Sequence, residues 1–92
     1  MSMDIVWDPN KARINKNKHK ISFSDVEPIF YDPNTLSYED GDSINEQRFI
    51  ATGSDALGRI ITVVYAYRNN QIRLISARRA SKQERCYYEK KL

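Results

Sequence analysis

The sequence predicts a small α+β domain in which helices cover a mostly antiparallel β-sheet. The chain has 92 residues, which allows one hydrophobic core and a single domain over residues 1–92. Its second half contains three consecutive runs rich in β-branched and aromatic residues, a pattern typical of a β-meander. Helix-capping patterns precede segments in the first third of the chain and near its C-terminal end. The expected order is strand, two helices, meander, helix.

The first third begins with a short apolar run, residues 4–7, which we interpret as an edge strand. Asp8 followed by Pro9 supplies an N-cap and a proline in the first helical turn. These residues predict a helix from Pro9 to about Lys18, and its many lysines and asparagines indicate a polar, mostly exposed surface.

A second, amphipathic helix is predicted after Ser22, because large apolar residues follow it at spacings of three and four. Asp25 is placed as the acidic partner of a capping box around Ser22. Pro28 lies inside this helix and should kink or shorten it, and residues 32–34 should end it in a turn. The apolar positions are Phe23, Val26, Ile29 and Phe30. Residues 37–44 are then expected to form a short strand and an acidic loop.

The meander is predicted from residues 46–52, 59–68 and 71–79. The turn residues 54–58 separate the first two runs, and Asn69 and Asn70 form a tight turn before the third. Ser81, with Glu84 three residues later, forms a capping box for a final helix from Lys82 to about Lys90.

The charge is distributed unevenly along the chain, although the net charge is only +3. Residues 32–57 carry one basic and six acidic side chains, whereas residues 58–92 carry nine basic and two acidic ones. Six of those nine are arginines, whose planar guanidinium groups bind phosphate or carboxylate through two parallel hydrogen bonds. The basic third suits RNA or an acidic protein partner. A solvated surface balanced by the acidic middle remains the alternative.

Several classes of protein are excluded by composition. One cysteine, Cys86, and one histidine, His19, cannot form a disulfide or a Cys/His zinc site within one chain, so no metal is expected. No apolar run is long enough to span a bilayer, and the N-terminus lacks a signal peptide, so we expect no membrane contact and a cytoplasmic location. His19 lies at the junction of the first two helices, where it could cap a helix or act as a base.

Alternation along the strands groups the candidate site residues. Glu46 and Arg48 share one face of their strand, either as part of a catalytic site or as half of a structural ion-pair network. In the last strand Ile72, Leu74, Ser76 and Arg78 are expected on one face, with Arg73, Ile75, Ala77 and Arg79 on the other. Arg78 is favoured for the site because it lies near the end of the strand. On the final helix Glu84 and Tyr88 share a stripe, and either Tyr87 or Tyr88 should close the core.

The motifs of this sequence resemble those of the BrnT family of type II toxin–antitoxin ribonuclease toxins, over nearly the whole chain. The most specific matching pieces are Trp7-Asp8, Asn15, Lys18-His19, Ile21-Ser22-Phe23, Glu46, Arg48, Gly58-Arg59, Ile75-Ser76-Ala77-Arg78, Glu84-Arg85 and Tyr88. The sequence departs from the family pattern at Lys20 and Gln47, and neither is a candidate functional group.

The resemblance implies a RelE-like fold and cleavage of RNA that halts translation. It also implies a BrnA-like ribbon-helix-helix antitoxin, which would bind operator DNA as part of a heterotetramer with the toxin. The catalytic residues it implies are Arg78, Glu46, Arg48, Tyr88 and His19. The expected RNA-binding residues are Arg73, Arg79, Arg59, Arg85 and Lys18.

Such a reaction requires no cofactor, because the RNA 2′-hydroxyl is itself the nucleophile. The protein has to hold the phosphate, accept a proton and stabilise the charge that develops in the transition state. Arg78 and Arg48 are expected at the scissile phosphate. Arginines around Glu46 would lower its pKa, which favours an orienting role over proton abstraction. A non-catalytic module that binds RNA or protein is the alternative. A DNA-binding regulator is disfavoured, because the sequence shows no helix-turn-helix with a basic recognition helix.

Overall fold

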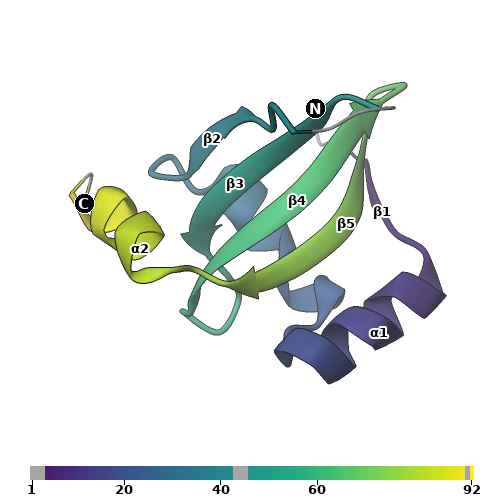
Figure 1. The fold of residues 1–92 in the computed structure, drawn as a ribbon, viewed down its shortest axis with the longest axis horizontal. Coiled ribbons are helices and arrows are strands. Elements are labelled where there is room, and N and C mark those ends of the chain that lie inside the picture. Colours follow the sequence, from purple (N-terminus) through teal and green to yellow (C-terminus); the bar gives the residue numbers. More distant parts are fainter. Residues whose placement is uncertain (1–3, 43–45, 91) are drawn as a thin grey trace.

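The structure is a computed structural model that describes residues 4–42, 46–90 and 92. Within these residues five strands form one mixed sheet of order β1-β5-β4-β3-β2 (Figure 1). The strands are β1 (Asp4–Val6), β2 (Leu36–Glu39), β3 (Arg48–Ser54), β4 (Ile60–Arg68) and β5 (Gln71–Arg79). Strands β2 to β5 pair antiparallel, and β1 pairs parallel to β5 at the edge. The predicted α+β class and edge strand are confirmed.

Two of the predicted helices have the expected starts. Helix α1 (Pro9–His19) begins at Asp8, whose side chain accepts a 2.7 Å hydrogen bond from the Asn10 amide, and it ends at Lys20 with a φ of 62°. Helix α2 (Lys82–Glu89) begins at Ser81 with both hydrogen bonds of the capping box. It projects from the end of β5 (Figure 1). None of the helices within the described ranges is long and apolar enough to cross a membrane.

The predicted second helix is wrong in type. The chain instead forms two short 3₁₀ helices, Phe23–Asp25 and Glu27–Tyr31, here called the 3₁₀ segment. Pro28 occupies the first turn of the second one, where its missing N–H costs no hydrogen bond, whereas a continuous α-helix would need that donor. Ser22 makes no side-chain cap, and Asp25 instead forms a 3.5 Å ion pair with Arg59.

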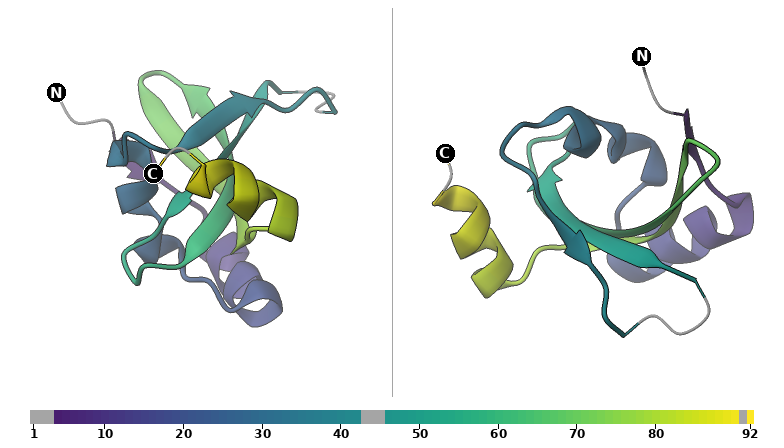
Figure 2. Two further views of the ribbon diagram at one scale, coloured as in Figure 1. Left: turned by 90° about the vertical axis from the view of Figure 1, so that its left-hand side faces the viewer. Right: turned by 90° about the horizontal axis from the view of Figure 1, so that it is seen from above.

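Of the predicted apolar positions, Phe23, Val26 and Ile29 are buried and Phe30 is partly buried, and all four pack in or against the core on one face of the sheet. Figure 2 shows the segment lying against the curved sheet, whereas α2 lies at one side of the molecule. The buried core residues are Ile21, Phe23, Val26, Ile29, Ala51, Ile61, Val63, Ile72, Leu74 and Ala77.

Helix α1 protects the part of the β5 edge that β1 does not cover. The buried Asn15 side chain donates to the Ala77 carbonyl at 2.9 Å and accepts from the Ala77 amide at 2.9 Å, as a neighbouring strand would. It also donates to the Ile21 carbonyl at 3.0 Å. One side chain therefore ties the helix, the following loop and the sheet edge together.

A bulge in β5 changes which side chains share a face. Val64 pairs with Ser76 but Tyr65 pairs with Leu74, so Ile75 has no partner on β4. The face prediction for this strand is therefore wrong beyond Leu74: Ala77 enters the core, and Arg78 moves to the opposite face with Arg73. We call the sheet face turned away from the core the open face. Its side chains come from Arg48, Ile50 and Thr52 of β3, Thr62, Val64, Ala66 and Arg68 of β4, and Arg73, Ser76 and Arg78 of β5.

Candidate functional site

One cluster on the open face is built around Glu46, which lies just before β3 rather than inside it. Arg73 donates to both carboxylate oxygens of Glu46, at 2.6 Å to Oε2, and Arg68 lies 3.4 Å from Oε1. Arg48 and Arg73 flank the small residue Ala66 in the same row of the sheet. The hydrogen bond from Arg73, and then the charges of Arg68 and Arg48, lower the pKa of Glu46. Glu46 is therefore an ionised, weakly basic carboxylate that orients arginines.

A second cluster on the open face joins Arg78 to helix α2. Glu84 Oε1 and Oε2 accept hydrogen bonds from Arg78 Nη1 at 2.7 Å and from Nη2 at 3.1 Å. Thr62 and the Ser81 amide also donate to Glu84, at 3.0 and 2.8 Å. These donors, Arg78 first, lower the pKa of Glu84 to about 2, so this carboxylate is not a general base at neutral pH. The Arg78 side chain remains 43% exposed, which leaves donors accessible to a ligand.

The two clusters lie on the same face at positions set by β4. Arg73 pairs with Ala66 and Arg78 pairs with Thr62, and these two β4 residues are separated by about 13 Å along the strand. Val64 lies between them. The described part of the open face thus carries four arginines against two carboxylates, since Arg48 and Arg68 belong to the first cluster. A positively charged face of this kind suits the phosphates of one nucleic-acid strand.

Tyr88 and His19, two of the catalytic candidates, lie outside both clusters. Tyr88 is the buried residue of α2 and donates a 2.5 Å hydrogen bond to Asp32. Burial, followed by this bond, raises the pKa of Tyr88 to about 12, and the same bond lowers the pKa of Asp32. Tyr88 therefore fastens α2 to the loop after the 3₁₀ segment. His19, together with Lys18, borders a pocket at the β5 edge that also includes Ser76, so it lies beside the open face.

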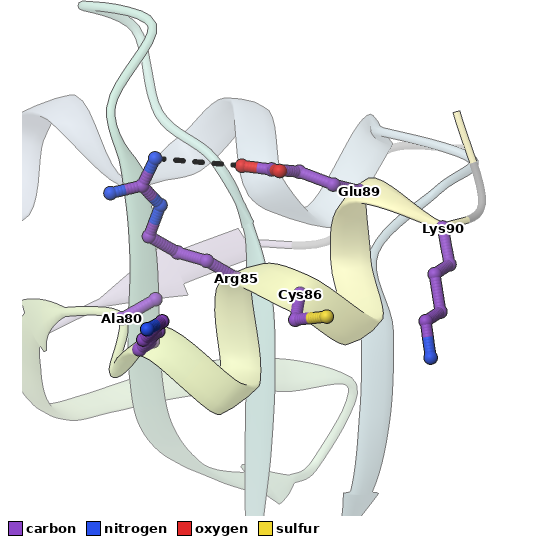
Figure 3. Close-up of a pocket in the computed structure, with 6 residues that line it drawn as sticks. Ala80, Arg85, Cys86, Glu89 and Lys90 are labelled. Atoms are coloured by element: carbon purple, nitrogen blue, oxygen red, sulfur yellow. Dashed lines mark ion pairs between the residues drawn. The ribbon is translucent and has the colours of Figure 1, made fainter.

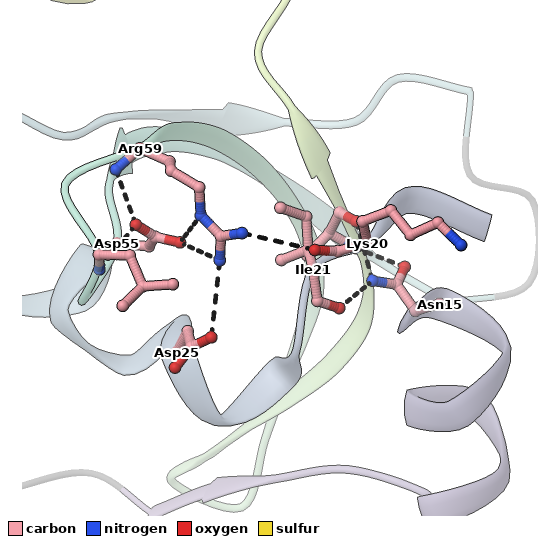
Figure 4. A network of polar contacts seen from close by, with 8 residues as sticks. Asn15, Lys20, Ile21, Asp25, Asp55 and Arg59 are labelled. Carbon is pink, nitrogen blue, oxygen red and sulfur yellow. Dashed lines mark hydrogen bonds and ion pairs between the residues drawn. The ribbon is translucent and has the colours of Figure 1, made fainter. Parts of the chain in front are cut away.

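Arg59 is engaged in a buried ion-pair network away from the open face (Figure 4). Its guanidinium lies 2.7 Å from Asp55 and 3.5 Å from Asp25, and it also donates to the Lys20 carbonyl at 3.4 Å. The Asp55 side chain is fully buried. Arg59 therefore connects the β3–β4 turn to the 3₁₀ segment and to the end of α1.

The remaining RNA-binding candidates lie near the end of β5 and on α2. Arg79 and Arg85 line a hollow together with Gly58 and Ile60. Arg85 also forms a 3.5 Å ion pair with Glu89 beside a second hollow, which Cys86 and Lys90 border (Figure 3). These side chains could extend a phosphate-binding surface beyond the open face.

Sequence reasoning missed three members of the two clusters. Arg68 could have been assigned to the same face as Ala66, because it lies two residues further along β4 and side chains alternate. Glu84 was recognised as a helix cap and as a neighbour of Tyr88 on the final helix, but nothing in the sequence indicates that its carboxylate also reaches Arg78. Thr62 carries no signal beyond a polar residue in an apolar strand. In the described ranges, no group of three or more His, Cys, Asp or Glu side chains could hold a metal ion.

The comparisons with known proteins indicate a class for this chain, the ribonuclease toxins of type II toxin–antitoxin systems. The family model for the ribonuclease toxin BrnT of such systems matches residues 7–84, so the chain belongs to the BrnT family. Among solved structures, the 1.1 Å crystal structure of the Brucella abortus ribonuclease toxin BrnT is similar, with 26% identity and a TM-score of 0.70. The match covers 88% of this chain and 100% of that one. No curated protein sequence matches significantly.

Proposed function

We propose that this toxin is a cytoplasmic, RelE-like endoribonuclease that requires no metal or other cofactor, uses the RNA 2′-hydroxyl as its nucleophile and inhibits translation. The observation that carries this proposal is the pair of arginine–carboxylate clusters on one sheet face. In such a site the arginines bind consecutive phosphates of a strand and stabilise the charge that develops on the scissile one. The family membership supports the same class of reaction.

In the proposed reaction the 2′-oxygen attacks the adjacent phosphorus, the bond to the 5′-oxygen breaks, and the products carry a 2′,3′-cyclic phosphate and a 5′-hydroxyl. Arg78 holds the scissile phosphate, and Arg48 and Arg73 hold the strand alongside. Glu46 orients Arg73 and Arg68, with which it makes hydrogen bonds, and its lowered pKa makes it a weak base. Proton transfer is assigned to His19, since both carboxylates are bound by arginine and Tyr88 is buried against Asp32.

The cell that makes such an enzyme must restrain it, and a type II system does so with a protein antitoxin. We propose a BrnA-like antitoxin with a ribbon-helix-helix domain, which binds the operator as part of a heterotetramer. The net positive charge of the open face suits acidic side chains on the toxin-facing surface of that partner. Purified antitoxin should then inhibit RNA binding and cleavage in proportion to the complex formed.

The test is cleavage of a mixed RNA by the purified chain in EDTA, with Arg78→Ala, Arg73→Ala and Arg13→Ala beside wild type. Arg13 is an exposed arginine of α1 and serves as the matched control. We expect Arg78→Ala to lower the rate by about 100-fold or more and to leave RNA affinity within about tenfold, as for a contact made mainly in the transition state. A deoxynucleotide at the cleaved position should abolish the reaction.

Wild-type rates in Arg73→Ala and Arg78→Ala would contradict the proposed site. If wild type binds RNA but does not cleave it, even after translating ribosomes are added, the chain is the non-catalytic module instead. Cleavage that appears only with ribosomes would identify a ribosome-dependent toxin.

A further inference from the structure

A further pocket, about 340 Å³ in volume, opens between α2 and the part of the sheet formed by the edge strand β2 and its neighbour β3. Its lining includes Leu36, Tyr38, Thr52, Gln83, Glu84 and Tyr87. Tyr38 and Tyr87 are 53% and 52% exposed, so neither ring is buried in the core. Two accessible rings from different elements therefore meet at the rim of one pocket.

The chemistry of this lining matches a nucleobase. Aromatic rings provide faces on which any base can stack, and an amide and a carboxylate beside them can hydrogen-bond to base edges. Gln83 Nε2 lies 3.3 Å from the Tyr87 hydroxyl, which positions the amide beside the ring. Lys90 Nζ lies 5.7 Å from the centre of the Tyr87 ring and adds a positive charge near this site.

The pocket adjoins the Arg78 cluster through shared residues. Glu84 lines the pocket and binds the Arg78 guanidinium at 2.7 Å. Thr52, another lining residue, pairs with Thr62, and Thr62 pairs with Arg78. Thr52 and Arg78 are thus two strand spacings apart, about 10 Å, which is comparable with the reach of a nucleotide from its phosphate to the far edge of its base.

We propose that this pocket is a nucleobase-binding subsite, in which Tyr38 and Tyr87 stack on the base of a nucleotide whose phosphate contacts Arg78. The inference rests on the proposed function and adds the element that would select where the RNA is cut. Arg78 and the Glu46 cluster hold the strand through phosphates, which carry no sequence information, whereas the base in this pocket is contacted directly. Gln83 is the side chain placed to discriminate between bases.

The test uses the full chain and two short single-stranded oligonucleotides with 2′-O-methyl riboses, which lack the attacking hydroxyl. One is fully abasic, and the other carries a single 2-aminopurine base, whose fluorescence is quenched by stacking. We expect the base to raise affinity by about tenfold or more over the abasic strand, the gain typical of a base stacked on an aromatic side chain. That gain, and the quenching, should disappear in Tyr38→Ala and Tyr87→Ala and persist in Tyr38→Phe and Tyr87→Phe.

Tyr31→Ala is the matched control, since Tyr31 is equally exposed, at 56%, on the 3₁₀ segment. It should keep the full gain. The inference is overturned if the base adds no affinity, or if both alanine variants keep the gain, while the abasic strand still binds in a manner that depends on Arg78. If neither oligonucleotide binds the wild-type chain, both the proposed function and the proposed subsite are contradicted.

Discussion

The Glu84 carboxylate holds Arg78 through two hydrogen bonds, at 2.7 and 3.1 Å, and thereby joins helix α2 to strand β5. The same carboxylate accepts from the Ser81 amide and from Thr62, so a single group caps the helix and contacts the sheet. The orientation of the arginine proposed to bind the scissile phosphate and the position of α2 therefore depend on each other.

Replacing Glu84 by Gln should make stability less dependent on pH in the acidic range. The pKa of Glu84 is lowered from 4.5 to about 2, first by Arg78, so the unfolded chain binds more protons between these values. The stabilisation by ionised Glu84 is complete above about pH 4.5 and is lost as the pH falls towards 2. Glu84→Gln should thus be less stable than wild type by about 1–2 kcal/mol at pH 7, and the difference should vanish near pH 2.

The measurement is the free energy of unfolding by urea across that pH range. Glu89→Gln is the control, because Glu89 is an exposed residue of the same helix with one 3.5 Å ion pair to Arg85. An unfolding free energy of Glu84→Gln that runs parallel to the wild-type curve at every pH would refute this assignment.

Tyr88→Phe should reduce stability and leave catalysis nearly intact. The substitution removes the hydroxyl that donates to Asp32 but keeps the buried ring. We expect a loss of about 1–2 kcal/mol in the free energy of unfolding and a cleavage rate within about threefold of wild type. Thermal unfolding and the RNA cleavage assay measure the two effects, with Tyr31→Phe as the control. A variant with wild-type stability and a severely reduced rate would instead assign Tyr88 to catalysis.

Arg59→Ala should destabilise the fold by about 3 kcal/mol or more, because it leaves the fully buried Asp55 carboxylate without its guanidinium partner. The double variant Arg59→Ala/Asp55→Asn removes both charges and should recover part of that loss. The amide introduced by Asp55→Asn would still offer a side-chain oxygen to the Leu57 and Arg59 backbone N–H groups, which donate to the Asp55 carboxylate in the wild type. Urea unfolding of the two single variants and the double variant measures the coupling.

RNA affinity of the folded Arg59→Ala variant should remain close to that of wild type. Stability within about 0.5 kcal/mol of wild type, combined with a tenfold loss of RNA affinity, would place Arg59 in the RNA interface instead.

Asn15→Ala should cost at least about 2 kcal/mol, since the substitution leaves buried backbone groups of Ile21 and Ala77 without hydrogen-bond partners. Asn17→Ala, on the exposed side of the same helix, is the matched control and should change stability by less than about 0.5 kcal/mol. Hydrogen exchange of the Ala77 amide provides a local readout, which should accelerate in Asn15→Ala alone. Equal stability of the two variants would show that α1 does not depend on this bond.

Local patterns in the sequence predicted those elements whose stabilising contacts lie within a few residues. The Asp8 cap, the Asn69–Asn70 turn and the Ser81 capping box were all predictable, because each hydrogen bond or backbone angle involves neighbours in the chain. Both asparagines of the turn have positive φ, at 55° and 62°, as a two-residue hairpin turn requires. The apolar spacing after Ser22 likewise predicted which side chains are buried, although not the type of helix that buries them.

The candidate site could not be assembled in the same way, because its contacts join residues far apart in the sequence. Glu46 meets Arg73 across 27 positions, and Asn15 meets Ala77 across 62. The open face itself depends on the bulge at Ile75, which moves Arg78 to the side of Arg73 and reverses the simple alternation of β5. Residue types and spacings thus established the fold class, the helix caps and the arginine-rich composition of the last third. The strand register and the unpaired residue Ile75 decide which of those arginines share a surface. Both depend on how the strands pack around the core of the folded protein.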